Sequence, residues 1–165
     1  MSSLSSNAEL KAALLEAKTI AVVGVSNNPV RASYFVVRYL HYRGYSIIPV
    51  NPAYAGQTLF GNTVLASLSD IPKSVNVDIV DIFRRADFVP EIVDEAIEHL
   101  LPGLKTIWMQ FGIWHEEAAA KARSHGLQTV ENRCPKIEYQ RLFGELRKAG
   151  INTGIVSSKL PEWTS

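Results

Sequence analysis

The sequence has little cysteine, little excess charge of either sign and no long apolar run. Its single cysteine, Cys134, excludes an intramolecular disulfide framework and suits a reducing compartment. The 17 basic and 16 acidic residues give a formal net charge of +1, which predicts no nonspecific binding of nucleic acid. No apolar run approaches the roughly 20 residues of a membrane-spanning helix, and the first residues lack the pattern of a secretory signal. We therefore expect a cytoplasmic protein with no membrane partner.

Several motifs that would assign a reaction are also missing. No cluster of His, Cys, Asp and Glu has metal-ligand spacing, and neither a G-x-S-x-G elbow nor a Walker loop is present. The dinucleotide fingerprint G-x-G-x-x-G is absent too, because Gly24 is followed by Ser26 and Pro29 where the second and third glycines would stand. The sequence thus predicts no metal and no catalytic residue. It leaves open whether the chain is an enzyme, with a binding protein as the favoured reading.

Short runs rich in Ile and Val do occur, and they alternate with segments of helical periodicity. The runs predict five strands, at Thr19–Gly24, Tyr45–Val50, Val77–Phe83, Leu104–Met109 and Leu127–Glu131. The intervening segments predict helices from Ser6 to about Ala17, at Ala32–Arg43, from Pro90 to about Leu100, at Glu116–Ser124, and from Pro135 to Gly150.

Alternating strands and helices indicate an α/β protein with a doubly wound, mostly parallel five-stranded sheet and helices on both faces. We expect the strand order 3-2-1-4-5, counted along the chain, and one domain over residues 1–150 followed by a tail at 151–165. Ligands of such sheets bind at the carboxyl ends of the strands, so the segments that follow the strands are the candidate site.

The first of these segments has the chemistry of an anion site. Gly24 permits a sharp turn, and the helix that follows offers free N–H groups at its positive end. Ser26, Arg31 and Ser33 add hydroxyl donors and a guanidinium able to hold a phosphate. The alternative is a structural turn with solvated polar residues.

The end of the second strand argues against NAD. A nicotinamide enzyme usually carries Asp or Glu here to hold the ribose hydroxyls, whereas this chain has Val50, Asn51 and Pro52. An amide can bind a ribose without repelling a nearby phosphate. NADP, or another nucleotide with an extra ribose phosphate, therefore remains open, as does a plain turn before proline.

The last three strands end in further candidates. Phe83 is placed to pack on an adenine and Arg84 to meet a phosphate, although a core phenylalanine and a solvated arginine are the alternatives. Gln110 and Gly112 follow the fourth strand, where a ligand can pass closely over the backbone. Cys134 follows the fifth strand beside an arginine, a setting in which a thiolate can be stabilised, although a lone cysteine is usually a small apolar residue.

Five motifs in this order resemble the small stand-alone coenzyme A-binding protein family, whose domain is similar to the N-terminal domain of the succinyl-CoA synthetase alpha subunit. The motifs are VVGVSNNPVRASYFVVRYLHYRGYSIIPVNP, SLSDIP, VDIVDIFRRADFVPEIVDEAI, WMQFGIWHEEAAAKARSHGL and ENRCPKIEY. The resemblance covers about residues 8–147 and implies a Rossmann-like fold that holds CoA or an acyl-CoA across the strand ends.

By this resemblance, the site divides into three parts. Phosphates would lie among Gly24, Ser26, Arg31 and Ser33, and the adenosine side would be lined by Val50, Asn51, Pro52, Phe83 and Arg84. The pantetheine arm would face Gln110, Gly112, Asn132 and Cys134, although the family more often has aspartate at the position of Asn132. The 3′-phosphate of CoA disfavours an acid after the second strand, and its pyrophosphate suits the first helix terminus.

Two other functions compete with CoA binding. The extra ribose phosphate would equally fit an NADP-dependent oxidoreductase, although the sequence lacks a Tyr-x-x-x-Lys pair and a base at the strand ends. Alternatively, Cys134 would form a mixed disulfide with the CoA thiol. The synthetases keep their phosphorylated histidine and ligase machinery in further domains, for which 165 residues leave no room, so the resemblance implies no ligase activity.

Overall fold

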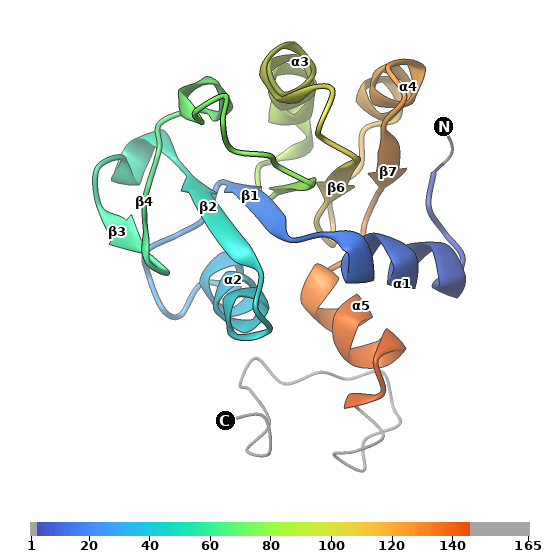
Figure 1. Ribbon diagram of the computed structural model, residues 1–165, viewed down its shortest axis with the longest axis horizontal. Helices are drawn as coiled ribbons and strands as arrows, with labels where there is room; N and C mark the ends of the chain where they lie inside the picture. The colour runs from blue at the N-terminus through green and yellow to red at the C-terminus, as the bar shows by residue number, and fades with distance from the viewer. Residues whose placement is uncertain (1–2, 146–165) are drawn as a thin grey trace.

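The structure is a computed structural model that describes residues 3–145, with a central parallel sheet between two layers of helices (Figure 1). The strands of this sheet are β1 (Thr19–Val23), β2 (Ser46–Val50), β5 (Ile79–Ile82), β6 (Thr106–Met109) and β7 (Gln128–Val130). The helices are α1 (Asn7–Glu16), α2 (Ala32–Tyr42), α3 (Val89–Leu100), α4 (Glu116–Ser124) and α5 (Pro135–Leu142). This confirms the predicted fold class. The predicted tail at 151–165 lies outside the described residues.

The strand order differs from the predicted one. The sheet runs β2-β1-β5-β6-β7, and every neighbouring pair is parallel. Counted along the chain, the five strands therefore have the order 2-1-3-4-5, and the predicted 3-2-1-4-5 is wrong. The order still reverses next to β1, so the crevice at the carboxyl ends lies between β1 and β5.

Pro49 explains why β2 lies at the edge of the sheet. Its carbonyl accepts a bond from Leu65 N–H at 2.9 Å, on the side of β2 that faces away from β1. In a parallel strand the N–H and C=O of one residue point the same way, so the N–H that Pro49 lacks would also point outward. An interior strand would lose a ladder bond there. Residues beyond β2 form the small hairpin of β3 (Thr58–Leu59) and β4 (Asn62–Thr63).

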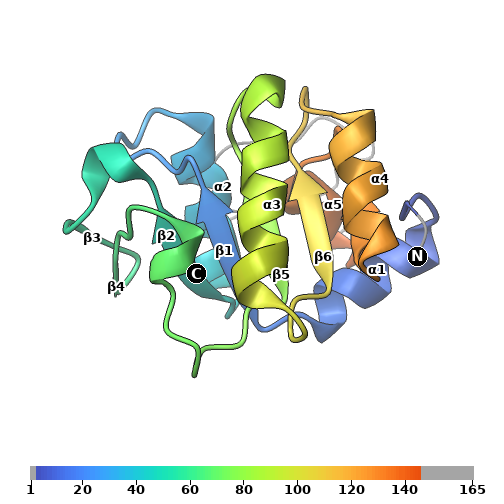
Figure 2. The same ribbon diagram turned by 90° about the horizontal axis from the view of Figure 1, so that it is seen from above.

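Each face of the sheet is covered by its own set of helices. Ala21 and Val23 of β1 pack in the core with α3 and α4, whereas Ile20 and Val22 pack in the core with α1, α2 and α5. Figure 2 shows α3 and α4 in front of the sheet, with α2 and α5 behind it. Right-handed crossovers require this division, because the chain moves one way from β1 to β2 and the other way from β5 to β7.

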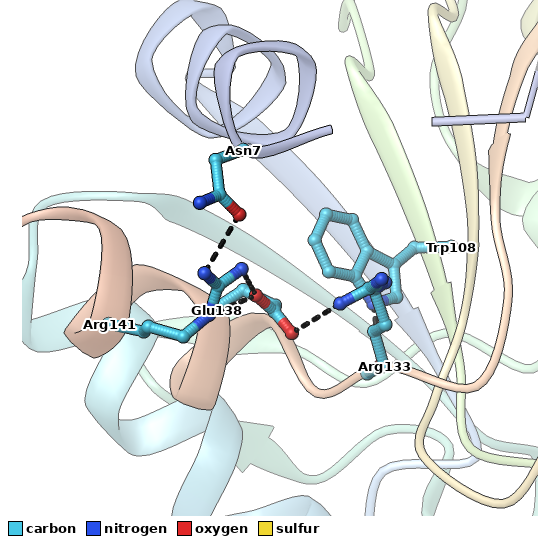
Figure 3. Close-up of polar contacts among 5 residues, drawn as sticks. All are labelled: Asn7, Trp108, Arg133, Glu138 and Arg141. Carbon is cyan, nitrogen blue, oxygen red and sulfur yellow. Dashed lines mark hydrogen bonds and ion pairs between the residues drawn. The ribbon is translucent and has the colours of Figure 1, made fainter. Parts of the chain in front are cut away.

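The first and last described helices hold each other in place. The Ser6 side chain caps α1 in a capping box with Glu9, as predicted. Arg141 of α5 donates to Asn7 Oδ1 at 2.8 Å and also binds Glu138 (Figure 3). Helix α5 ends at Leu142, earlier than predicted, because Gly144 adopts a φ of +79° just after it.

Residues 3–145 contain neither a membrane-spanning helix nor a cluster of side chains that could bind a metal. No helix in this range is long and apolar enough to cross a membrane. Over the same residues, no three or more His, Cys, Asp and Glu side chains gather where they could hold a metal ion.

Candidate functional site at the carboxyl ends of the strands

The turn after β1 is built around Gly24, for two reasons. Its φ of +92° lies in the left-handed region, which residues with a side chain avoid. A Cβ here would also lie 3.0 Å from Arg84 Cδ and 3.1 Å from the Phe83 carbonyl oxygen. The chain after β5 therefore passes directly over Gly24, and the turns after β1 and β5 pack together.

The two predicted serines shape the loop from inside. Ser26 N–H donates to Ser33 Oγ at 2.9 Å, and Ser26 Oγ accepts from Asn28 N–H at 3.0 Å. Asn28 Oδ1 in turn accepts from Val30 N–H at 3.1 Å. The loop is thus held by its own side chains, and Asn28, which the sequence analysis did not single out, contributes as much as the serines.

The start of α2 presents free donors at the end of this loop. Within residues 3–145, the N–H groups of Ala32 and Ser33 have no protein acceptor, and Arg31 makes no side-chain cap bond. Two N–H groups without a protein acceptor at the positive end of an 11-residue helix have the chemistry that suits an anion. The exposed Arg31 side chain stands at the same helix start.

One pocket, of about 230 Å³, lies on the β2 side of the turn and is called here the arginine pocket. Its lining includes Val50, Pro52, Ser67, Arg84, Phe88 and Glu91. The Arg84 guanidinium lies 4.2 Å from the centre of the Phe88 ring, an arrangement that limits its freedom. Asn51 does not line this pocket, because its side chain donates to Val25 O and accepts from Ala53 N–H, both at 2.9 Å.

A second pocket, of about 380 Å³, lies between α2, β6 and the start of α5 and is called here the thiol pocket. It brings together Phe83, Gln110 and Cys134, with an apolar wall that includes Phe35, Ile113 and Ile137. Phe83 and Arg84 are adjacent in the sequence but line different pockets, so the structure does not group Phe83 with the other residues predicted for the adenosine side.

Gly112 and Asn132 meet each other beside the thiol pocket without lining it. Gly112 N–H donates to Asn132 Oδ1 at 2.7 Å, and the two residues have φ values of +88° and +58°. This bond joins the loop after β6 to the loop after β7. Asn132 therefore positions the loops, and asparagine suits its left-handed backbone. Phe111, from the same loop, lines the pocket and is 71% exposed.

Cys134 is 6% exposed and differs from the predicted stabilised thiolate. Burial raises the pKa of its thiol, and the Ile137 N–H, the Gln110 side chain and the Lys136 N–H act against this effect only in part. The neighbouring Arg133 does not offset burial, because its guanidinium binds Glu138 at 3.1 Å (Figure 3). Of the two alternatives that the sequence left open, burial therefore favours a small apolar cysteine over a thiolate stabilised by Arg133.

Asp81 is a fully buried carboxyl that the sequence analysis did not identify. It lies on β5 with an exposure of 0%, and among residues 3–145 neither of its oxygens has a hydrogen-bond partner. Burial raises its pKa well above the ordinary value, so the neutral acid is favoured in the folded protein. Asp81 is in register with Val22 and Trp108, which share one core cluster with Cys134, and its charge raises the pKa of the Cys134 thiol. A polar residue inside the apolar run VDIVDIF is the signal that could have found it.

These features define a class of protein. The sheet is Rossmann-like, and its crevice combines a glycine turn, a helix start with free N–H groups and two pockets on either side of β1 and β5.

Comparison with known proteins then shows the family. The model of a CoA binding domain matches residues 18–140, and the chain belongs to that family. It is 35% identical to the uncharacterized protein YneT of Bacillus subtilis (strain 168) over 134 residues, which are 81% of this chain and 94% of YneT. This confirms the resemblance seen in the sequence motifs.

Two solved structures extend the comparison. A Thermus thermophilus protein is 37% identical, with a TM-score of 0.78, and the match covers 84% of this chain and all of that one. The dinucleotide forming acetyl-coenzyme A synthetase 1 of Ca. Korarchaeum cryptofilum is 25% identical, with a TM-score of 0.56. That match covers 70% of this chain but 26% of the synthetase.

Proposed function

We propose that this protein binds coenzyme A or an acyl-CoA across the carboxyl ends of its strands, as a binding protein of the cytoplasm without ligase activity. The pyrophosphate lies at the start of α2, the adenosine end occupies the arginine pocket, and the pantetheine arm runs into the thiol pocket. The observation that carries this proposal is the pair of free N–H groups of Ala32 and Ser33, which stand at the turn between the two pockets.

The residues present fit the chemical groups of CoA. Free backbone donors at a helix start suit a pyrophosphate. The guanidinium of Arg84 suits a ribose phosphate, which would bind on the Arg84 side of the pocket, away from Glu91 and Glu95 in the same lining. In the thiol pocket, the buried Gln110 Oε1 has no partner and offers an acceptor for a pantetheine amide N–H. The apolar wall of that pocket suits the thiol end or an acyl group.

Isothermal titration with CoA and with 3′-dephospho-CoA tests the proposal. We expect CoA to bind and dephospho-CoA to bind more weakly, because a charge-assisted contact to the 3′-phosphate is lost. Negligible heat with both ligands would refute the proposal. Binding of NADPH, seen as enhanced fluorescence, in place of CoA would favour an NADP-dependent oxidoreductase.

Two neighbouring arginines provide a matched pair of variants. Arg84→Ala should weaken CoA binding roughly 10- to 100-fold, the effect of one hydrogen bond to a charged group. Arg85→Ala should change it less than about twofold, because Arg85 points to solvent and pairs with Asp87 at the surface. Equal losses in the two variants would show only a general effect of positive charge.

A further inference from the structure

Cys134 stands where a thiol can react with the end of a ligand. It is the N-cap residue directly before α5, and it lines the thiol pocket together with Gln110 and apolar side chains. Under the proposed function, the pantetheine arm ends in this pocket, so that a thioester carried by CoA would lie against the Cys134 sulfur. Phe35, Phe83 and Ile137 give that place an apolar wall.

The start of α5 and Gln110 bring N–H groups to the same pocket, while the Cys134 side chain itself makes no cap hydrogen bond to α5. The backbone N–H groups of Lys136 and Ile137 and the side-chain amide of Gln110 all favour charge at the Cys134 sulfur, against the larger effect of burial on its pKa. Two N–H groups at a helix start and a glutamine amide are also the donors found in oxyanion holes. Gln110 is 8% exposed, and its Oε1 has no partner, so this side chain is only half satisfied without a ligand.

Two ionisable groups lie close enough to interact with the thiol. Lys136 is 4% exposed, burial lowers the pKa of its ammonium, and a charge on Cys134 opposes that shift. Asp81 is fully buried on β5, where burial favours its neutral acid, and its charge when ionised raises the pKa of the Cys134 thiol. An amine with a lowered pKa that lines the same pocket as the thiol is suited to accept the thiol proton.

We propose that Cys134 accepts the acyl group of a bound acyl-CoA, which makes the protein a self-acylating acyl carrier; this inference rests on the proposed function. The Cys134 sulfur attacks the thioester carbonyl carbon, and the carbonyl oxygen becomes an oxyanion held by the donors around the sulfur. The bond from carbon to the CoA sulfur then breaks. The proton of Cys134 passes through the Lys136 amine to the leaving CoA thiolate. One thioester replaces another, so the step needs no oxidant or reductant.

The same position argues for acyl transfer over disulfide exchange. A thiolate that attacks a disulfide forms no oxyanion, so in that reaction the donors from Gln110 and the start of α5 would act only on the attacking sulfur. An acyl group that forms a thioester with Cys134 is also enclosed by the apolar wall of the pocket, which protects it from hydrolysis.

The test is intact-mass spectrometry of the full chain after incubation with butyryl-CoA. We expect one butyryl group per chain, localised to the peptide that contains Cys134 and removed by neutral hydroxylamine, which cleaves thioesters. Cys134→Ser should take up none while it keeps the wild-type melting curve. Butyryl-N-acetylcysteamine, which has the thioester but no nucleotide, should react far more slowly because nothing binds it. Peptide mapping of the wild type gives the answer even if the variant does not fold.

Several results would overturn the inference. A butyryl group that resists hydroxylamine, or that appears equally in Cys134→Ser, would show acylation elsewhere. A CoA-sized adduct removed by a reducing agent would show disulfide exchange instead. CoA binding by calorimetry without any adduct would refute acyl transfer alone, whereas absence of CoA binding would refute the proposed function as well.

The role of Gln110 has its own test. Gln110→Leu should slow acylation at saturating butyryl-CoA roughly 10²-fold, the usual effect of removing one oxyanion donor. Gln110→Glu keeps the shape but not the donor and should be slowed to a similar extent. An unchanged acylation rate in both variants would remove Gln110 from the proposed site.

Discussion

The buried carboxyl of Asp81 should make the protein less stable as the pH rises. In the folded protein burial raises its pKa well above the ordinary value, whereas in the unfolded chain the carboxyl ionises near pH 4. Between these two pKa values the folded state holds one more proton than the unfolded state. The free energy of unfolding is therefore greatest below the unfolded pKa and falls as the pH rises toward the folded pKa.

The size of the effect follows from proton linkage. One proton corresponds to about 1.4 kcal/mol per pH unit, so Asp81 alone should cost about 2.7 kcal/mol between pH 5 and pH 7 while it stays protonated in the folded state. Asp81→Asn cannot ionise and should not show this loss. Relative to the wild type, the variant should gain that amount of stability over the same interval.

Equilibrium urea denaturation of the wild type and Asp81→Asn, at half-unit steps from pH 5 to pH 8, measures the difference. All other titrating groups are shared, so only the difference between the two curves matters. Asp81→Leu serves as the control. Leucine cannot ionise either, and it has no amide group, so the pH dependence of its unfolding free energy should run parallel to that of Asp81→Asn. If the wild-type curve runs parallel to both variants, the buried carboxyl is not held neutral and the reasoning fails.

Two further predictions concern the turn and the thiol. Gly24→Ala should cost about 1–2 kcal/mol for the left-handed backbone and should also displace Arg84. Gly56→Ala is the matched control, because Gly56 has a φ of +90° and no neighbour within 4 Å, so that only the backbone cost applies. Urea denaturation should show a larger loss of stability for Gly24→Ala than for Gly56→Ala. Titration should show a weaker affinity for CoA in Gly24→Ala alone. Because burial raises the pKa of Cys134, iodoacetamide should alkylate it at pH 7 more slowly than free cysteine, and its rate should level off at a higher pH than that of free cysteine; equal rates at pH 7 would contradict its burial.

The sequence predicted the fold class well because its strands are nearly continuous runs of Ile and Val. The observed strands differ from the predicted ones by at most two residues at either end. The strand order was missed, although the sequence contained the clue. Pro49 within the second strand cannot donate to a neighbour on its outer side, which favours an edge position. A general preference for one strand order was followed instead of this local signal.

The sequence predicted which segments of the chain form the candidate site, but not which of their side chains line its pockets. Every predicted segment reaches the carboxyl ends of the strands, because strand ends can be read from the sequence. Which pocket a side chain enters depends on its direction as the chain leaves the strand, and Phe83 and Arg84 leave β5 in opposite directions. Asn51 and Asn132 were assigned to ligand contact, yet both bind backbone groups of neighbouring loops.

The pairing of α1 with α5 delays completion of the fold during synthesis. Asn7 and Arg141, which are bonded to each other, are 134 residues apart. At about 5–20 residues per second, the ribosome needs roughly 7 to 27 seconds to make the stretch between them. During that interval α5 has not yet been made, so the apolar side chains of Leu10 and Leu14, which are fully buried in the folded protein, lack part of the surface that covers them. A nascent chain stalled before residue 135 should therefore be bound by chaperones and sensitive to protease at its first helix.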